Sequence, residues 1–157
     1  MMRGVIEVNT EQRERMVRKV QHAAGVTDLS GTTISVLGLT FKAGTDDLRD
    51  SPSLAVISRL RELDATVKAF DPTTTGALSA LQQSFLEGIN VEQSVDDAIA
   101  EGDVLVLLTE WPEFRSLDVE HTKELLAGTA IVDTRNLLDP QSVRAAGLSY
   151  DGVGRPE

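Results

Sequence analysis

Two basic residues, Lys42 and Arg49, lie in a polar segment that could bind an anion. The segment 38–52 reads Gly-Leu-Thr-Phe-Lys-Ala-Gly-Thr-Asp-Asp-Leu-Arg-Asp-Ser-Pro and comes at the end of an apolar run. A lysine ammonium in such a loop can bind a phosphate as a point charge. A loop that cradles a dinucleotide would instead read G-x-G-x-x-G and lead straight into a helix, so we do not expect that role here. The alternatives are that Lys42 is a plain surface residue and that Arg49 pairs with a neighbouring aspartate.

Asp71, Trp111 and Arg135 each follow another apolar run, and each allows two interpretations. Asp71 stands where a nucleotide-binding domain holds its ribose-binding acid, but Pro72 after it favours a turn. Trp111, the only tryptophan, either anchors its loop to the core or lines a pocket. The guanidinium of Arg135 either clasps a diphosphate or ribose through paired donors or pairs with a neighbouring acid. These positions predict an anion site and leave the individual roles open.

Short apolar runs alternate with amphipathic segments along the chain, which predicts strands alternating with helices. The expected strands are 32–39, 66–70, a short one from Val91, 103–108, 130–133 and an edge strand in 148–153. The expected helices are 5–24, 52–63, 77–86, 95–101, 117–126 and 140–146. This alternation is typical of right-handed βαβ units, so we predict an α/β fold: a Rossmann-like, mostly parallel sheet with helices on both faces.

The carboxyl ends of the predicted strands are the place where a ligand would bind, because ligands of such sheets lie beyond those ends. The loops that would lie there are 39–51, 71–76, 109–115 and 134–139. Lys42 and Arg135 follow different parallel strands, so we expect both side chains to face one shared anion site.

Composition restricts the chemistry that this chain can perform. Its 157 residues suit one domain with a continuous core. The absence of cysteine excludes disulfides and cysteine nucleophiles, and with His22 and His121 expected in solvent we predict neither a catalytic residue nor a metal site. A net charge of −10 argues against a nucleic-acid partner. The longest apolar run, Val104–Leu108, is too short to cross a bilayer and no signal peptide is visible, so we expect a cytoplasmic protein without a membrane partner.

Several motifs of the chain resemble those of the UDP-glucose/GDP-mannose dehydrogenase family. The segment 38–52 matches the family signature G-[LF]-x-F-K-x-x-T-x-D-x-R-x-S-P. Similar motifs follow in the family's order: FDP at 70–72, TEWPEF at 109–114, DTRNLLDP at 133–140 and YDGVGR at 150–155. The segment 5–12 (VIEVNTEQ) resembles the end of the long helix that links the two halves of these enzymes. The resemblance spans nearly the whole chain and indicates the C-terminal, UDP-binding domain, most like that of the bacterial UDP-glucose branch.

The resemblance implies how the work is divided between two halves of an enzyme. Family members oxidise the C6 alcohol of the sugar to a carboxylate with two NAD⁺, through a thiohemiacetal, and the N-terminal half holds NAD. Residues 1–25 would be the end of the linking helix, and residues 26–157 the UDP-sugar-binding domain. Phe41, Lys42 and Arg135 would contact the UDP-sugar, and Arg49 would reach the NAD diphosphate. The implied partners are a UDP-sugar, the N-terminal NAD-binding domain and, in the full-length enzyme, the second subunit of a homodimer.

Two alternative functions of different class remain open. One is the same domain of a sister enzyme that takes GDP-mannose or a UDP-N-acetyl-hexosamine, and the other is a freestanding nucleotide-binding module with a regulatory role. We expect the chain alone to fold but to lack dehydrogenase activity, because it has no thiol nucleophile. The risk to folding alone lies in the apolar stripe of Met16, Val17 and Val20 in the first helix, whose packing partners could lie outside this chain.

Overall fold

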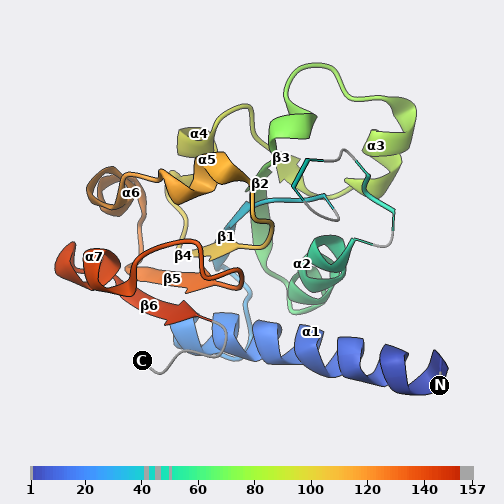
Figure 1. Ribbon diagram of the computed structural model, residues 1–157, viewed down its shortest axis with the longest axis horizontal. Coiled ribbons are helices and arrows are strands. Elements are labelled where there is room, and N and C mark those ends of the chain that lie inside the picture. The colour runs from blue at the N-terminus through green and yellow to red at the C-terminus, as the bar shows by residue number, and fades with distance from the viewer. Residues whose placement is uncertain (1, 41–42, 45–46, 50, 153–157) are drawn as a thin grey trace.

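The computed structural model describes residues 2–40, 43–44, 47–49 and 51–152, and it contains a six-stranded sheet (Figure 1). The strands are β1 (Thr33–Leu37), β2 (Thr66–Phe70), β3 (Asn90–Val91), β4 (Val104–Leu107), β5 (Ala130–Asp133) and β6 (Ser149–Gly152). Their order in the sheet is β3-β2-β1-β4-β5-β6, and all neighbouring strands pair in parallel. The predicted α/β fold with a Rossmann-like parallel sheet is confirmed.

The strand register places the carboxyl ends of the strands in one row. Leu37 pairs with Phe70 on one side and with Leu107 on the other, Leu107 pairs with Asp133, and Asp133 pairs with Gly152. The direction of the strand order reverses between β1 and β4, which makes the space beyond their ends the topological switch point. The loops that follow the strands therefore leave from a common edge.

Helices cover both faces of this sheet, as the alternation predicts. They are α1 (Met2–Ala24), α2 (Pro52–Glu62), α3 (Ala80–Phe85), α4 (Val95–Ile99), α5 (Pro112–Arg115), α6 (Val119–Leu125) and α7 (Pro140–Ala145), with a 3-10 turn at Pro72–Thr74. Ser51 caps α2, because its side chain accepts the backbone N–H of Leu54 at 3.4 Å, and Pro52 supplies the first helical position.

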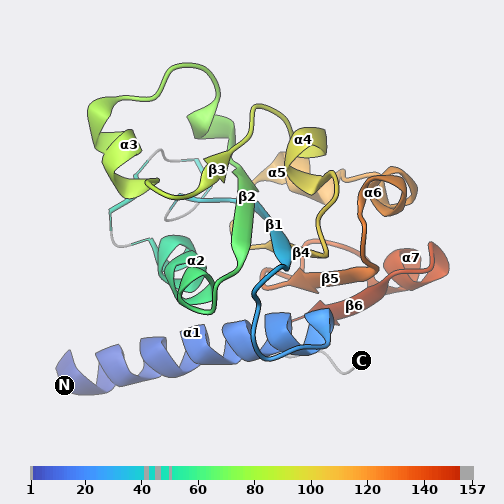
Figure 2. The ribbon, with the colours of Figure 1, turned by 180° about the vertical axis from the view of Figure 1, so that it is seen from behind.

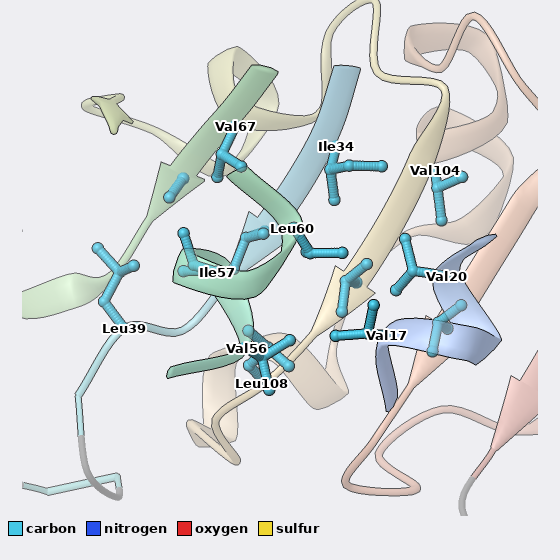
Figure 3. Packing of buried hydrophobic residues seen from close by; sticks show 14 of the residues in the cluster. Val17, Val20, Ile34, Leu39, Val56, Ile57, Leu60, Val67, Val104 and Leu108 are labelled. Carbon is cyan, nitrogen blue, oxygen red and sulfur yellow. The ribbon is translucent and has the colours of Figure 1, made fainter. Parts of the chain in front are cut away.

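Two hydrophobic clusters hold the helices to the sheet, one on each face. On the first face α1 and α2 pack over the strands, as the side chains in Figure 3 show. Its buried residues include Val17 and Val20 of α1, Val56, Ile57 and Leu60 of α2, and Ile34, Val67 and Val104 of the strands. On the second face Ala98 and Ile99 of α4, Phe114 of α5 and Val143 of α7 pack on Leu105, Leu107 and Ile131. The sheet is thus a buried middle layer.

The helix α1 lies along one side of the molecule and packs against it with its C-terminal part (Figure 2). Val17 is 3% exposed and Val20 is fully buried, so this stripe has packing partners within the chain and the risk named for it is not realised. Polar contacts support the packing: Lys19 Nζ lies 2.7 Å from Asp151 Oδ1 of β6, and Arg59 Nε of α2 lies 3.1 Å from Glu14 Oε1. The helix is therefore part of the packed unit that the structure describes.

Two predicted helices begin later than expected, and local capping explains both. The helix expected at 77–86 begins only at Ala80, because Ser79 and Gln82 form a capping box there. The helix expected at 117–126 begins at Val119, where the Asp118 side chain accepts the backbone N–H of His121. Within the described part of the chain, no helix combines the length and the apolar character needed to cross a membrane.

Candidate functional site

The loops after β1 and β4 touch each other at the switch point. Gly38 has a φ of 106°, and a Cβ there would lie 2.5 Å from Thr109 Cβ, so only glycine fits. The backbone N–H of Gly38 donates to Phe70 O at 2.9 Å, and the Thr109 hydroxyl donates to Thr40 O at 3.2 Å. Close approach of these backbones fixes where the segment carrying Lys42 leaves the sheet.

Asp71 is fully buried and organises the turns on the β1 side of the edge. Its Oδ2 accepts hydrogen bonds from the backbone N–H groups of Leu39 (2.8 Å) and Thr40 (3.2 Å). Its Oδ1 accepts the backbone N–H of Thr73 at 2.9 Å and the Thr73 hydroxyl at 2.7 Å. Because both carboxylate oxygens are engaged inside the protein, the structure favours the turn interpretation over a ribose-binding acid.

Trp111 anchors its loop to the same carboxylate. Its Nε1 donates to Asp71 Oδ2 at 3.2 Å, and its ring packs against the cluster on the second face. Of the two interpretations from the sequence, the structure therefore favours anchoring. The connection joins the ends of β2 and β4 across β1, which lies between them.

Asp133 plays the corresponding part on the β5 side, and sequence reasoning missed this role. Its Oδ1 accepts the backbone N–H of Arg135 at 3.2 Å, and its Oδ2 accepts that of Leu138 at 2.9 Å. The buried Tyr150 of β6 donates its hydroxyl to the same Oδ2 at 2.9 Å. The signal in the sequence was an aspartate ending an apolar strand, seen twice, at Asp71 and at Asp133.

Arg135 lies at the end of β5, and its side chain lies across the end of β4. Its Nε donates to Leu108 O at 3.0 Å. Among the residues that the structure describes, no carboxylate is within ion-pair distance of this guanidinium and its terminal nitrogens donate to no protein atom. The ion-pair interpretation of Arg135 therefore finds no support in the described part, and its paired donors are available to an anion.

Arg49 is in a different setting. It is exposed, and its Nε lies 3.2 Å from Asp47 Oδ1, which also accepts the Arg49 backbone N–H at 2.9 Å. The pKa of Asp47 is lowered, first by this backbone hydrogen bond and then by the one from the arginine side chain. This is the neighbouring ion pair named as the alternative. Arg49 lines a groove together with residues of α3, and Arg135 is not among the residues that line it.

The remaining predicted site residues, Phe41 and Lys42, lie outside the described residues. The predicted meeting of Lys42 with Arg135 therefore stays a prediction. No group of histidines and carboxylates in the described part could hold a metal ion. His121 instead contacts Asp96, with Nε2 at 2.8 Å from Oδ2, and this carboxylate raises the pKa of His121 above its ordinary 6.5.

The model of the UDP-glucose/GDP-mannose dehydrogenase family, UDP binding domain, matches residues 35–140. The UDP-glucose 6-dehydrogenase of Rhizobium meliloti is 41% identical over 97% of this chain and 34% of its own length. TuaD, a UDP-glucose 6-dehydrogenase of Bacillus subtilis, is 38% identical over 99% of this chain and 33% of its own. The chain thus spans about a third of the curated relatives that it matches.

A solved structure agrees with these sequence relatives. The UDP-glucose dehydrogenase of Pyrobaculum islandicum superposes with a TM-score of 0.77 at 26% identity, over 98% of this chain and 32% of that one. The matched region begins in β1 and ends at the start of α7, so it contains the carboxyl-edge loops described above. The chain belongs to the UDP-glucose/GDP-mannose dehydrogenase family and corresponds to its UDP binding domain.

Proposed function

We propose that this chain is the C-terminal, nucleotide-sugar-binding domain of a UDP-glucose 6-dehydrogenase. In this proposal residues 26–157 form the domain and residues 1–25 are the end of the linking helix. The observation that carries it is the Arg135 guanidinium, which lies across the end of β4 with terminal nitrogens that donate to no described residue. Such a group binds a diphosphate through two parallel, charge-assisted hydrogen bonds.

The proposed substrate contacts are Phe41, Lys42 and Arg135. Lys42 belongs to the loop after β1 and Arg135 to the loop after β5, and the two loops leave the same edge on either side of β4. Local cations are needed there, because a chain of net charge −10 repels an anionic substrate elsewhere. Similarity to relatives named UDP-glucose 6-dehydrogenase supports UDP-glucose as the substrate.

The described residues do not form a dinucleotide site. Gly38 lies in close contact with Thr109, at a place where a loop that binds a phosphate would need open space. Both carboxylate oxygens of Asp71 already accept hydrogen bonds from the protein. We therefore propose that NAD is held mainly by the N-terminal half, with Arg49 contributing one contact to the NAD diphosphate. In the complete enzyme two NAD⁺ would be needed for each UDP-glucose, one for each of the two hydrides that are removed as the C6 alcohol is oxidised to the carboxylate of UDP-glucuronate. The proposal includes a homodimer acting in the cytoplasm.

Substitutions in the complete enzyme, with its NAD-binding half present, test this proposal. Arg135→Ala and Lys42→Ala should each weaken UDP-glucose binding about tenfold or more while NAD binding stays unchanged, because each removes a charge-assisted contact to phosphate. Arg49→Ala should weaken NAD binding instead. Lys123→Ala is the matched control, since it removes a positive charge from α6, on the second face of the sheet.

The same titrations separate the proposal from its alternatives. Unchanged UDP-glucose affinity in both Lys42→Ala and Arg135→Ala would reject the site. Preferential binding of GDP over UDP would point to a GDP-mannose enzyme. Turnover of UDP-glucose by the chain of 157 residues alone, surviving repurification, would reject the view that it is the binding half.

A further inference from the structure

We infer that Tyr150 is a positioning residue for Arg135: it fixes, through Asp133, the loop that presents the guanidinium, without touching the ligand. The inference rests on the proposed function of Arg135 and extends it to a residue of the neighbouring strand. It also gives a role to the first residue of the YDGVGR motif.

The contact between Tyr150 and Asp133 is short and buried. The tyrosine is 3% exposed and the aspartate is fully buried. The Tyr150 hydroxyl donates to Asp133 Oδ2 at 2.9 Å. A hydrogen bond to a buried carboxylate in this setting is stronger than one between neutral groups. The tyrosine therefore restrains where this carboxylate lies.

The carboxylate of Asp133 in turn holds both ends of the short loop after β5. One oxygen accepts the backbone N–H of Arg135, and the other accepts that of Leu138. Between them Asn136 takes the left-handed conformation, with a φ of 55°. A backbone shape of this kind persists when the surrounding contacts determine it. A change at Asp133 will consequently reach Arg135 through the main chain.

The position of Arg135 matters because a guanidinium recognises a diphosphate by geometry as well as by charge. Its Nε is already engaged by Leu108 O, which aligns the plane of the group along the end of β4. If the loop shifts, the two terminal nitrogens no longer meet the phosphate oxygens together. Affinity for the nucleotide is then lost even though none of the residues that contact the ligand has been substituted.

Tyr150→Phe tests this effect while it keeps the ring, which has a separate packing role. The ring lies in the cluster on the second face, and the guanidinium of Arg144 is 6.0 Å from its centroid. Phenylalanine keeps both contacts and removes only the hydroxyl. Ser149→Ala is the matched control, since it removes a hydroxyl of the same strand that donates to Thr129 O, away from Asp133.

The experiment is steady-state kinetics of the complete enzyme with a double-mutant cycle. Tyr150→Phe should raise KM for UDP-glucose about fivefold, the effect of one lost hydrogen bond, with kcat and KM for NAD unchanged. In the Arg135→Ala background Tyr150→Phe should not raise KM for UDP-glucose further, because the guanidinium through which Tyr150 affects the ligand has been removed. Ser149→Ala should behave as the parent enzyme does.

The outcomes distinguish this inference from the proposed function. If Arg135→Ala raises KM and Tyr150→Phe does not, or if the two effects add, the inference is wrong and the proposed function stands. If Arg135→Ala itself has no effect, the proposed function fails first. Should Tyr150→Phe not yield folded enzyme, Asp133→Asn tests the same connection in the same cycle.

Discussion

The loops after β1 and β5 leave the same edge of the sheet, but the protein holds their cations in different ways. Arg135 sits two residues beyond a buried aspartate that binds its backbone N–H, and its side chain is bound to the end of β4. Arg49 lies twelve residues beyond Leu37, the last residue of β1, and pairs on the surface with Asp47, two residues earlier in the sequence.

This difference indicates two uses of positive charge. The Arg135 side chain is exposed, but its Nε donates to Leu108 O and its backbone N–H to the buried Asp133, so the guanidinium is preorganised and binding a ligand costs little conformational entropy. The exposed ion pair between Arg49 and Asp47 contributes little stability, so Arg49 can exchange this pair for a contact outside this unit. The first suits a substrate that this chain binds itself, and the second suits a ligand held mainly by another part of the enzyme.

The largest expected effect concerns the point where the β1 loop meets the β4 loop. Gly38→Ala should lower the free energy of unfolding by about 3 kcal/mol, because the new methyl group collides with Thr109 and φ is positive. Gly44→Ala is the control: φ is also positive, but nothing lies within 4 Å, so the loss should be roughly 1 kcal/mol. Urea denaturation of both variants measures the difference. Equal losses would mean that the two loops do not depend on this close approach.

The next effect compares the two buried aspartates. Asp71→Asn should destabilise the chain by about 3 kcal/mol and Asp133→Asn by about 2 kcal/mol, because Asp71 accepts from more groups and an amide replaces one acceptor by a donor. Only Asp71→Asn should change the emission of Trp111, the single tryptophan. Thermal or urea unfolding followed by fluorescence checks both statements. A change of emission in Asp133→Asn would show that the two networks are not separate.

The smallest effect lies away from both loops, between α4 and α6. Asp96 raises the pKa of His121 in the folded chain above its ordinary value of 6.5. The stabilisation by this contact is therefore complete below pH 6.5, and it is lost as the pH rises through the pKa of the folded chain. Parent and His121→Gln should therefore differ in stability at acidic pH and converge at alkaline pH. Unfolding midpoints measured across this range test the sign. A difference that grows with pH would contradict the contact.

Much of the fold follows from local features of the sequence. The segments 103–108 and 130–133 predict buried strands, which the structure has at Val104–Leu107 and Ala130–Asp133, and Ser51 followed by Pro52 predicts the start of a helix. The aspartate–proline pair at 71–72 predicts the turn. Helix boundaries near Ala80 were less accurate, because a capping box of two polar side chains decides them.

The organisation of the site could be predicted only in part. That a cation follows β5 was visible in the sequence, but the partners of Arg135 were not. The bond from Tyr150 to Asp133 joins residues 17 positions apart, and that from Trp111 to Asp71 joins residues 40 apart. Such contacts depend on strand order and register, which the composition of a single strand does not determine.

The affinity of the complete enzyme for UDP and for uridine, with and without Arg135→Ala, tests most directly whether this residue binds an anion at the carboxyl edge. Inhibition constants of the two ligands against UDP-glucose supply the numbers. If Arg135 binds the diphosphate, the substitution weakens UDP about tenfold and leaves uridine unchanged, because uridine has no phosphate to lose. An equal loss for both ligands would place Arg135 on the ribose or base, and no loss for either would contradict the site.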